Sequence, residues 1–446
     1  MSLPSSVVVL DNGGGLCKAG IGGDRDPIAV VPNCMGRSST GSHHHHGSNK
    51  SKKWLVADQL QDSDDVMSIR RPLDRGYLIN PDLQKEIWDR IFKALLKVDP
   101  SDSSLLLVEP LFNLPSIQRS TDELVFEDFG FQSLYVADSP SLVHLYETSR
   151  CPPDRVMATS QCSLVVDCGF SFTHAAPVFQ NFTLNYAVKR LDLGGKALTN
   201  YLKELVSYRS INVMDETFIM DDVKEKLCCV SLNVPRDLQV ARKTGKDNLF
   251  RCSYTLPDGV AQLKGYVKDP KETQRYLTLA DDTPADPPQG NIGESGELLE
   301  GDRSKDSRSI DLTNNEEIVL TNERFLVPEM LFHPADLGMN EAGLAECIVR
   351  AIEACHPYLH PVLFNSIILT GGSTQFPRFA ERLKRELRPL VCDEYQVTIT
   401  TQEDPTLGVW RGGSLLASSP DFEAMCVTKS EYEELGSARC RRRFLH

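Results

Sequence analysis

Two stretches of the chain share one design, and this pairing limits the possible folds more than any other feature. Residues 7–10 form an apolar, valine-rich run that leads into Asp11 and the glycines at 13–15. Residues 163–169 repeat this design around Asp167. Such runs predict buried strands, and the glycines permit tight turns and close approach of another molecule. The repeat favours two similar halves that face each other across a cleft.

A third glycine loop, at 371–373, follows a further apolar run at 367–369. None of the three spacings matches a P-loop or a dinucleotide fingerprint, in which one glycine loop opens one helix. The amides of a glycine turn can surround a phosphate, to which Lys18 could add a positive charge. Asp11 could orient a hydrated divalent metal ion. For the first stretch taken alone, an ordinary hairpin with a glycine-rich turn is the alternative.

The composition limits which partners the protein can bind and in which cell compartment it can lie. The 446 residues carry a formal net charge of −14, which argues against a surface that grips nucleic acid broadly. The 13 cysteines are irregularly spaced and indicate reduced thiols in an intracellular protein. No apolar run reaches the length of a membrane span. The sequence therefore predicts a nuclear or cytosolic protein without a membrane anchor.

Four segments differ from the rest of the chain. The four histidines within 41–48 are bracketed by Gly-Ser pairs and are interpreted as an engineered tag in a loop. Residues 284–308 are acidic and rich in proline, glycine and serine, which predicts disorder. Basic clusters at 50–53 and 439–443 could serve nuclear import or lie near DNA, although short charge runs are usually solvated surface.

Further motifs complete a pattern that resembles actin and the actin-related proteins over nearly the whole chain. The motifs lie at 10–20, 71–76, 126–129, 166–174, 191–196, 224–228, 322–325, 369–373 and 410–418. The resemblance implies an α/β, actin-like fold with two related halves around a nucleotide cleft and four subdomains. Residues 213–217, 167–174 and 431–434 are most similar to a nuclear branch of the family, found in chromatin-remodelling complexes that exchange a Z-type variant of histone two-A into nucleosomes.

The resemblance also implies how the chain divides. Subdomain 1 would comprise 1–32, 71–157 and 408–446, and subdomain 2 would comprise 33–70, including the histidine run. Subdomain 3 would comprise 158–193 and 329–407. Subdomain 4 would comprise 194–328 and would contain the acidic insert at about 281–315. An insert of this size suits either a segment that orders on a partner or a passive solvated loop.

The family's nucleotide site maps onto matching positions of this chain. The implied binding residues are Asp11, Gly13, Gly14, Gly15, Lys18, Gly169, Gly195, Lys196, Lys224, Glu225, Gly371, Gly372 and Ser373. ATP with Mg²⁺ or Ca²⁺ is the implied cofactor, with Asp11 and Asp167 facing the metal through water, and an empty cleft is the alternative. For Lys224 and Glu225, a solvated helix face would be the default without the resemblance.

The second loop departs from the family pattern. Phe170 and Ser171 replace an acid and a glycine, and a phenyl ring cannot make water-mediated metal contacts. Glu123 is matched to the family's water-positioning glutamine, and a carboxylate beside phosphates weakens binding unless a cation compensates. His174 could be structural or could shuttle protons. These departures predict slow or absent hydrolysis and no assigned catalytic residue.

Three functions compete at this point. The first is a non-enzymatic scaffold, monomeric outside its complex, which docks other subunits of a nuclear remodelling assembly and contacts nucleosomes locally or through them. It would reside in the nucleus, with some in the cytoplasm. The second is an ATP-hydrolysing filament former like conventional actin. The third is a small-molecule kinase on the same fold, which ranks last because no additional catalytic acid is found.

Overall fold

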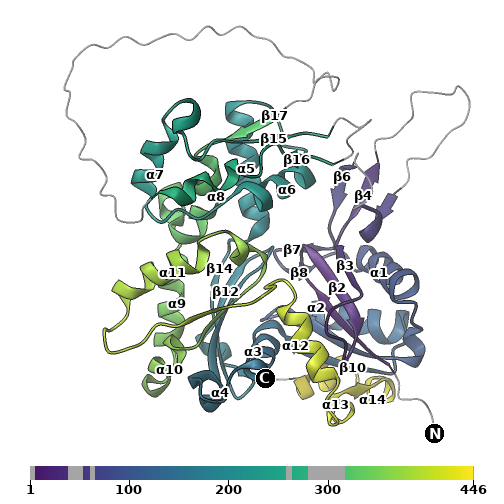
Figure 1. Ribbon diagram of the computed structural model, residues 1–446. Coiled ribbons are helices and arrows are strands. Elements are labelled where there is room, and N and C mark those ends of the chain that lie inside the picture. Colours follow the sequence, from purple (N-terminus) through teal and green to yellow (C-terminus); the bar gives the residue numbers. More distant parts are fainter. Residues whose placement is uncertain (1–5, 39–53, 61–65, 258–263, 280–316, 445–446) are drawn as a thin grey trace, which may run out of the picture.

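The computed structural model describes residues 6–38, 54–60, 66–257, 264–279 and 317–444. Within these residues, two six-stranded mixed sheets stand side by side and each carries a smaller lobe at the same end of the molecule (Figure 1). This arrangement confirms the predicted α/β architecture with two halves. The subdomain boundaries given above stay a prediction. The histidine run at 41–48 and the insert at 281–315 lie outside the described residues.

The first large sheet has the strand order β20-β10-β9-β1-β2-β3. Its strands are β1 (Val7–Asn12), β2 (Leu16–Ile21), β3 (Ala29–Pro32), β9 (Ser104–Glu109), β10 (Ser133–Asp138) and β20 (Val427–Thr428). β1 is antiparallel to β2 and parallel to β9, and β9 is parallel to β10. The central strands are buried on both faces, as their continuous apolar runs predict.

The second large sheet repeats this topology. It comprises β11 (Cys162–Cys168), β12 (Thr173–Phe179), β13 (Phe182–Thr183), β14 (Lys189–Leu191), β18 (Ile367–Thr370) and β19 (Ile399–Thr401). β11 is antiparallel to β12 and parallel to β18, and β18 is parallel to β19. In the first hairpin Asp11 lies opposite Lys18, and in the second Asp167 lies opposite His174. The internal repeat read from the sequence is therefore a repeat of sheet topology.

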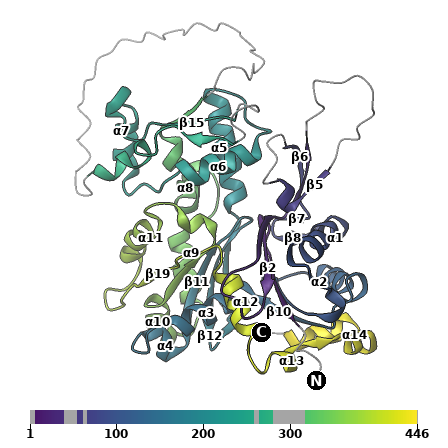
Figure 2. The same cartoon turned by 45° about the vertical axis from the view of Figure 1, so that its right-hand side comes forward.

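Smaller sheets build the lobes and the segment between them. One lobe holds β4 (Met35–Ser38), β5 (Trp54–Val56) and β6 (Val66–Arg70), and the other holds β15 (Cys252–Thr255), β16 (Tyr266–Val267) and β17 (Glu317–Leu320). β7 (Leu73–Asp74) and β8 (Tyr77–Leu78) form a hairpin near the centre (Figure 2). The three strands of the first lobe all fall within residues 33–70.

Helices cover the outer faces of the two sheets and separate them at the base. They are α1 (Pro81–Arg90), α2 (Pro115–Glu123), α3 (Ser139–Arg150), α4 (Val156–Ser160), α5 (Gly195–Arg209), α6 (Thr217–Leu227), α7 (Val234–Ala241), α8 (Glu323–Phe332), α9 (Leu344–Glu353), α10 (His360–Phe364), α11 (Phe379–Leu387), α12 (Gly408–Ala417), α13 (Phe422–Met425), α14 (Lys429–Leu435) and α15 (Ser437–Cys440). α6 carries Lys224 and Glu225 in its last turn.

The two halves share a core at their base. α3 and α12 pack against each other between the sheets, and apolar side chains from β1, β9, β11 and β18 join them in one cluster. The indole of Trp410 on α12 is fully buried and donates to the carbonyl of Val9 on β1. Gly412 allows α12 to approach the backbone of α3, since an added Cβ would lie 2.0 Å from the Leu142 carbonyl oxygen. This base connects the halves through a shared apolar core.

The cysteines agree with the predicted reduced state. All 13 are free thiols, and only Cys392 is exposed and Cys151 partly exposed. Burial raises the pKa of the Cys34 and Cys229 thiols to about 11, so these groups stay protonated near neutral pH. Within the described residues, no helix is both long enough and apolar enough to cross a bilayer.

Candidate functional site

The three glycine loops meet in a single cavity between the halves. Each follows the end of a central strand, β1, β11 or β18, and together they line a space of about 410 Å³. The lining includes Asp11, Gly13, Gly14, Gly15, Lys18, Asp167, Gly169, His174, Gly195, Lys224, Glu225, Gly371, Gly372 and Ser373. The structure therefore brings nearly all the residues proposed from the sequence to one place.

Lys18 and Asp11 neutralise each other at the first loop. The Lys18 ammonium donates to Asp11 Oδ2 at 2.8 Å, and both side chains are about nine-tenths buried. Burial acts to lower the pKa of Lys18, but the Asp11 carboxylate holds it above its ordinary value. The positive charge predicted for a phosphate is therefore already paired within the hairpin.

Asp167 has a partner that the sequence interpretation missed. The Ser139 hydroxyl, at the start of α3, donates to Asp167 Oδ2 at 2.7 Å. Burial raises the pKa of Asp167, and the nearby Asp11 charge acts in the same direction. Gly371 has a φ of +88° and lies so close that an added Cβ would be 2.9 Å from Asp167 Oδ1. The third loop thus closes directly over the second carboxylate.

His174 lines the cavity with an unpartnered nitrogen. Its side chain is buried, and Nε2 has no hydrogen-bond partner among the described residues. Burial and the neighbouring Arg190 charge lower its pKa to about 4, so the imidazole is neutral near pH 7. A neutral imidazole can accept or donate one hydrogen bond at this nitrogen according to its tautomer. The choice between a structural residue and a proton shuttle stays a prediction.

We expect acid to destabilise the protein through two buried imidazoles. The pKa values of His144 and His174 are lowered from 6.5 to about 4. Below pH 6.5 the unfolded chain binds protons that the folded protein does not bind until about pH 4. The free energy of unfolding should therefore fall as pH falls through this window, by about 2 kcal/mol per imidazole at pH 5.

Urea unfolding at pH 7, 6 and 5 measures this effect. Buried carboxyls such as Asp167 have raised pKa values and titrate in the opposite sense, so each variant is compared with wild type at the same pH. His144→Gln and His174→Gln should each lose less stability between pH 7 and pH 5 than wild type does. Parallel losses in wild type and variants would rule out the imidazoles as the cause.

The second loop lies directly against the first. An added Cβ at Gly15 would lie 2.8 Å from Cγ of Phe170, and one at Gly14 would lie 2.4 Å from the Ser171 hydroxyl. The Arg71 guanidinium covers the Phe170 ring at 4.5 Å and donates to the Gly14 carbonyl at 3.4 Å. The departures from the family pattern therefore fill the space between the two loops.

The start of α5 supports the second loop. The amides of Gly195 and Lys196 donate to the carbonyls of Gly169 and Phe170 at 3.0 and 2.8 Å. Gly194 permits this approach, because an added Cβ would lie 2.6 Å from the Phe172 nitrogen. The helix N-terminus, which is suited to an anion in general, here satisfies loop carbonyls instead.

Lys224 is buried and is not part of a solvated helix face, whereas Glu225 beside it is exposed at the edge of the cavity. The Lys224 ammonium is buried and donates to Gly195 O, Thr199 Oγ1 and Asp221 Oδ1 at 3.2, 2.7 and 2.9 Å. These three bonds use all its donors. Glu225 lines the cavity, and burial raises its pKa. Lys224 therefore fixes α5 on α6, while Glu225 faces the space where the resemblance implies a base or ribose.

Two predicted site residues lie elsewhere. Glu123 is exposed at the end of α2 and does not line the cavity, so its carboxylate does not stand beside the loops. Neighbouring helix residues differ in direction by about 100°, and it is Asp122 that faces inward. Lys196 lies on the outer side of the second loop, where its ammonium is 3.1 Å from Asp74 Oδ1 on β7.

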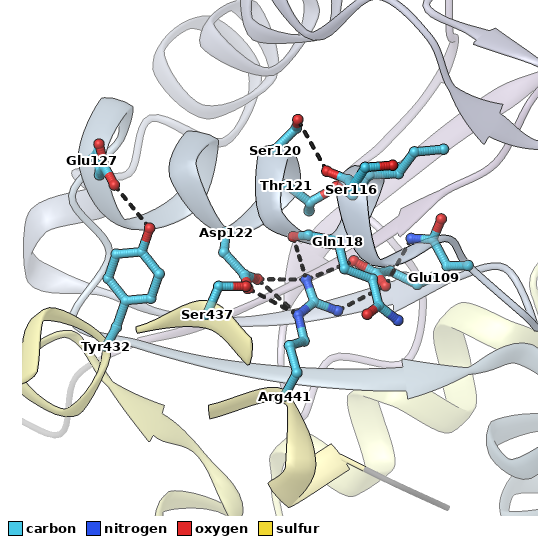
Figure 3. A network of polar contacts seen from close by, with 12 residues as sticks. Glu109, Ser116, Gln118, Ser120, Thr121, Asp122, Glu127, Tyr432, Ser437 and Arg441 are labelled. Atoms are coloured by element: carbon cyan, nitrogen blue, oxygen red, sulfur yellow. Dashed lines mark hydrogen bonds and ion pairs between the residues drawn. The ribbon is translucent and has the colours of Figure 1, made fainter. Parts of the chain in front are cut away.

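In the basic cluster at 439–443, Arg439, Arg442 and Arg443 are exposed, as expected of solvated surface, but the Arg441 side chain is buried. Arg441 donates to both oxygens of Glu109 at 2.8 and 3.0 Å, to Asp122, and to the Gln118 carbonyl at 3.1 Å (Figure 3). Ser437 also donates to Asp122. Since Glu109 lines the cavity, this network ties the end of the chain to the cavity wall. The cluster at 50–53 lies outside the described residues.

The two ends of the cavity differ in how well they suit a nucleotide. Glu225, Gly371, Gly372, Ser373 and Phe376 leave room where a base and ribose would lie. At the opposite end Lys18 and Asp11 are paired with each other, and the Phe170 and Ser171 side chains lie against the glycine loop, so this end offers a metal-bound triphosphate fewer free polar groups. No group of three or more His, Cys, Asp or Glu side chains suited to a metal occurs in the described residues.

Comparison with known sequences defines the class of protein. The profile of the actin family matches residues 2–445, and the chain belongs to this family. The two-sheet architecture described above is the actin fold.

Among similar proteins, "Actin-related protein 6" of Oryza sativa subsp. japonica is 67% identical over 99% of both chains. The protein of the same name from Arabidopsis thaliana is 62% identical over 99% of this chain and 100% of its own. That of Dictyostelium discoideum is 37% identical over 99% and 94% of the two chains.

Proposed function

We propose that the chain is a non-enzymatic actin-fold scaffold subunit of a nuclear chromatin-remodelling complex that deposits a Z-type histone variant into nucleosomes. Any ATP in its cleft is held without efficient hydrolysis. The full-length similarity to the actin-related protein 6 sequences supports the branch of the family. The contact of Phe170 and Ser171 with Gly15 and Gly14 is the single observation that carries the absence of catalysis.

The physical reason is the arrangement of charge at the loops. Hydrolysis of a phosphoanhydride needs cationic or amide groups aimed at the charge that develops on the phosphoryl oxygens. Lys18 is paired with Asp11, and the Gly195 and Lys196 amides are bonded to the second loop. The phenyl ring of Phe170 replaces a polar group beside the glycines. Few groups are left to stabilise a transition state.

Nucleotide content and turnover test this proposal directly. Denaturing extraction of the purified protein, followed by chromatography, gives the bound ATP and ADP. We expect either ATP that persists over hours or no nucleotide, and no measurable release of phosphate. Predominantly ADP, or phosphate release that scales with protein concentration, would contradict the proposal and favour an ATP-hydrolysing filament former, which salt-induced pelleting would then reveal.

A double variant tests whether the Phe170 and Ser171 side chains are what weakens nucleotide binding at the loops. Phe170→Asp combined with Ser171→Gly restores the acid and glycine of the family pattern and removes the side chains from the gap. We expect the variant to show a higher unfolding temperature in the presence of Mg-ATP, while wild type shows a smaller rise or none. Tyr358→Ala, at a side chain that is 85% exposed, serves as the control and should behave as wild type.

The scaffold role is tested in the assembly. Nuclear complexes isolated through an affinity-tagged copy of the chain should support ATP-dependent exchange of dimers containing a Z-type histone variant into nucleosome arrays. Complexes from cells that lack the chain should lose this activity and recover it with the wild-type chain. Equal exchange with and without the chain would contradict the proposed role.

A further inference from the structure

The first of two aromatic contacts crosses the cleft at the glycine loops. The Phe170 ring comes from the β11–β12 turn of the second half. One side of the ring packs against Gly15 of the first half, and the Arg71 guanidinium, also of the first half, lies 4.5 Å from its centre. A guanidinium over an aromatic face is attracted by the negative charge of the ring face. The ring thus contacts two elements of the opposite half.

The second contact lies two residues further along the same turn. Phe172 packs on Gly76, where an added Cβ would lie 2.1 Å from its Cε1 atom, and Gly76 has a φ of +80°. The Arg190 guanidinium, from β14, lies 4.4 Å from the centre of the Phe172 ring and donates to the Tyr77 hydroxyl at 3.2 Å. The hairpin of β7 and β8 is therefore bound to the second half by a ring and a cation together.

We propose that these four side chains, Phe170, Phe172, Arg71 and Arg190, form a cross-cleft clasp that holds the two halves closed without a nucleotide. The base of the cleft is already joined by α3, α12 and their shared core. With the clasp at the loops, the halves are connected at both ends of the cavity. The exposed ion pair of Lys196 with Asp74 crosses at the same level and adds little by itself.

The clasp makes the arrangement of the two halves independent of ligand binding. In a two-half protein whose loops meet only through a ligand, removal of the ligand frees the halves to rotate about their base. Here the chain supplies its own contacts at the same loops. A ligand can shift an equilibrium only by its preference for one state, so a protein that is already closed gains no further closure from nucleotide. The outer surfaces that partners contact would keep one arrangement.

Hydrogen exchange and small-angle X-ray scattering of the full chain test the clasp. For wild type stripped of nucleotide, we expect the same radius of gyration and the same amide exchange at 13–16 and 71–78 as with added Mg-ATP. Arg71→Met combined with Arg190→Met removes both cations and keeps much of the side-chain volume. Exchange at 71–78 should then be about tenfold faster or more.

Arg439→Met combined with Arg442→Met changes two exposed arginines and is the matched control, with wild-type exchange expected. If the double variant of Arg71 and Arg190 fails to fold, Phe172→Leu is a milder variant that should also speed amide exchange at 71–78. A wild-type protein that expands when stripped of nucleotide, or a clasp variant with unchanged exchange, would overturn the inference. ATP turnover by a protein that stays closed would contradict the proposed function and leave the clasp intact.

Discussion

Arg441→Ala is expected to lower the free energy of unfolding by about 3–5 kcal/mol. The Arg441 side chain is 9% exposed, and its guanidinium neutralises Glu109 and Asp122, which lie on different elements. Its removal leaves two carboxyl groups buried without a cation. Burial already raises the pKa of Asp122 against the opposing effect of Arg441, so the variant should protonate this group more readily. Urea unfolding at pH 7 measures the loss.

Arg442→Ala is the matched control for this prediction. Arg442 is the next residue, carries the same charge and is exposed, so its removal should change stability by less than about 0.5 kcal/mol. Arg441→Lys should recover only part of the lost stability, because one ammonium cannot face two carboxylates in the bidentate geometry of a guanidinium. A loss below about 1 kcal/mol for Arg441→Ala would show that the network contributes little.

Gly412→Ala is the second substitution for which we expect a large loss in the free energy of unfolding. In an exposed helix, alanine is the better helix former by about 1 kcal/mol. At this position, however, the new Cβ would lie 2.0 Å from the carbonyl oxygen of Leu142 and 2.5 Å from its carbon. Neither backbone can move without separating α12 from α3 in a closely packed core. We expect a loss of about 3 kcal/mol, measured by urea unfolding.

Gly413→Ala provides the comparison within the same helix. There the added Cβ would meet the ends of side chains, 3.0 Å from Val9 Cγ1 and 3.3 Å from Leu106 Cδ2, and these can shift. The loss should be clearly smaller than for Gly412→Ala. Equal losses for the two variants would show that crowding of backbone at Leu142 is not the cause.

The sequence predicted those parts of the site that depend on local pattern. Asp11 and Asp167 end buried strands in the structure because apolar runs rich in valine define the strands and glycines define the turns. The hydrogen-bonded register of Asp11 with Lys18 also follows from the hairpin. The start of α3 carries a signal that was overlooked. Asp138 caps the helix by accepting from the Ser141 amide, and this start places Ser139 beside Asp167.

The remaining features depend on contacts between distant segments. Arg441 lies 332 positions from Glu109, so its basic cluster could not be told from solvated surface. The direction of Lys224, toward the start of α5, follows from how two helices pack and not from the charge pattern of one. Glu123 was wrongly assigned to the site. A motif match gives the order of residues along the chain, but it does not say toward which side of a helix a residue points.

The first half of the molecule is discontinuous, and this has a consequence for the order in which the protein is made. β20 pairs with β10 at the edge of the first sheet, and α12 packs on β1. These elements lie after the whole of the second half in the chain. A ribosome that adds about 5–20 residues per second would therefore hold the first sheet incomplete for many seconds while the second half is synthesised. Until α12 and β20 emerge, β10 presents an unpaired edge, and chaperone binding during synthesis would most benefit the protein in that interval.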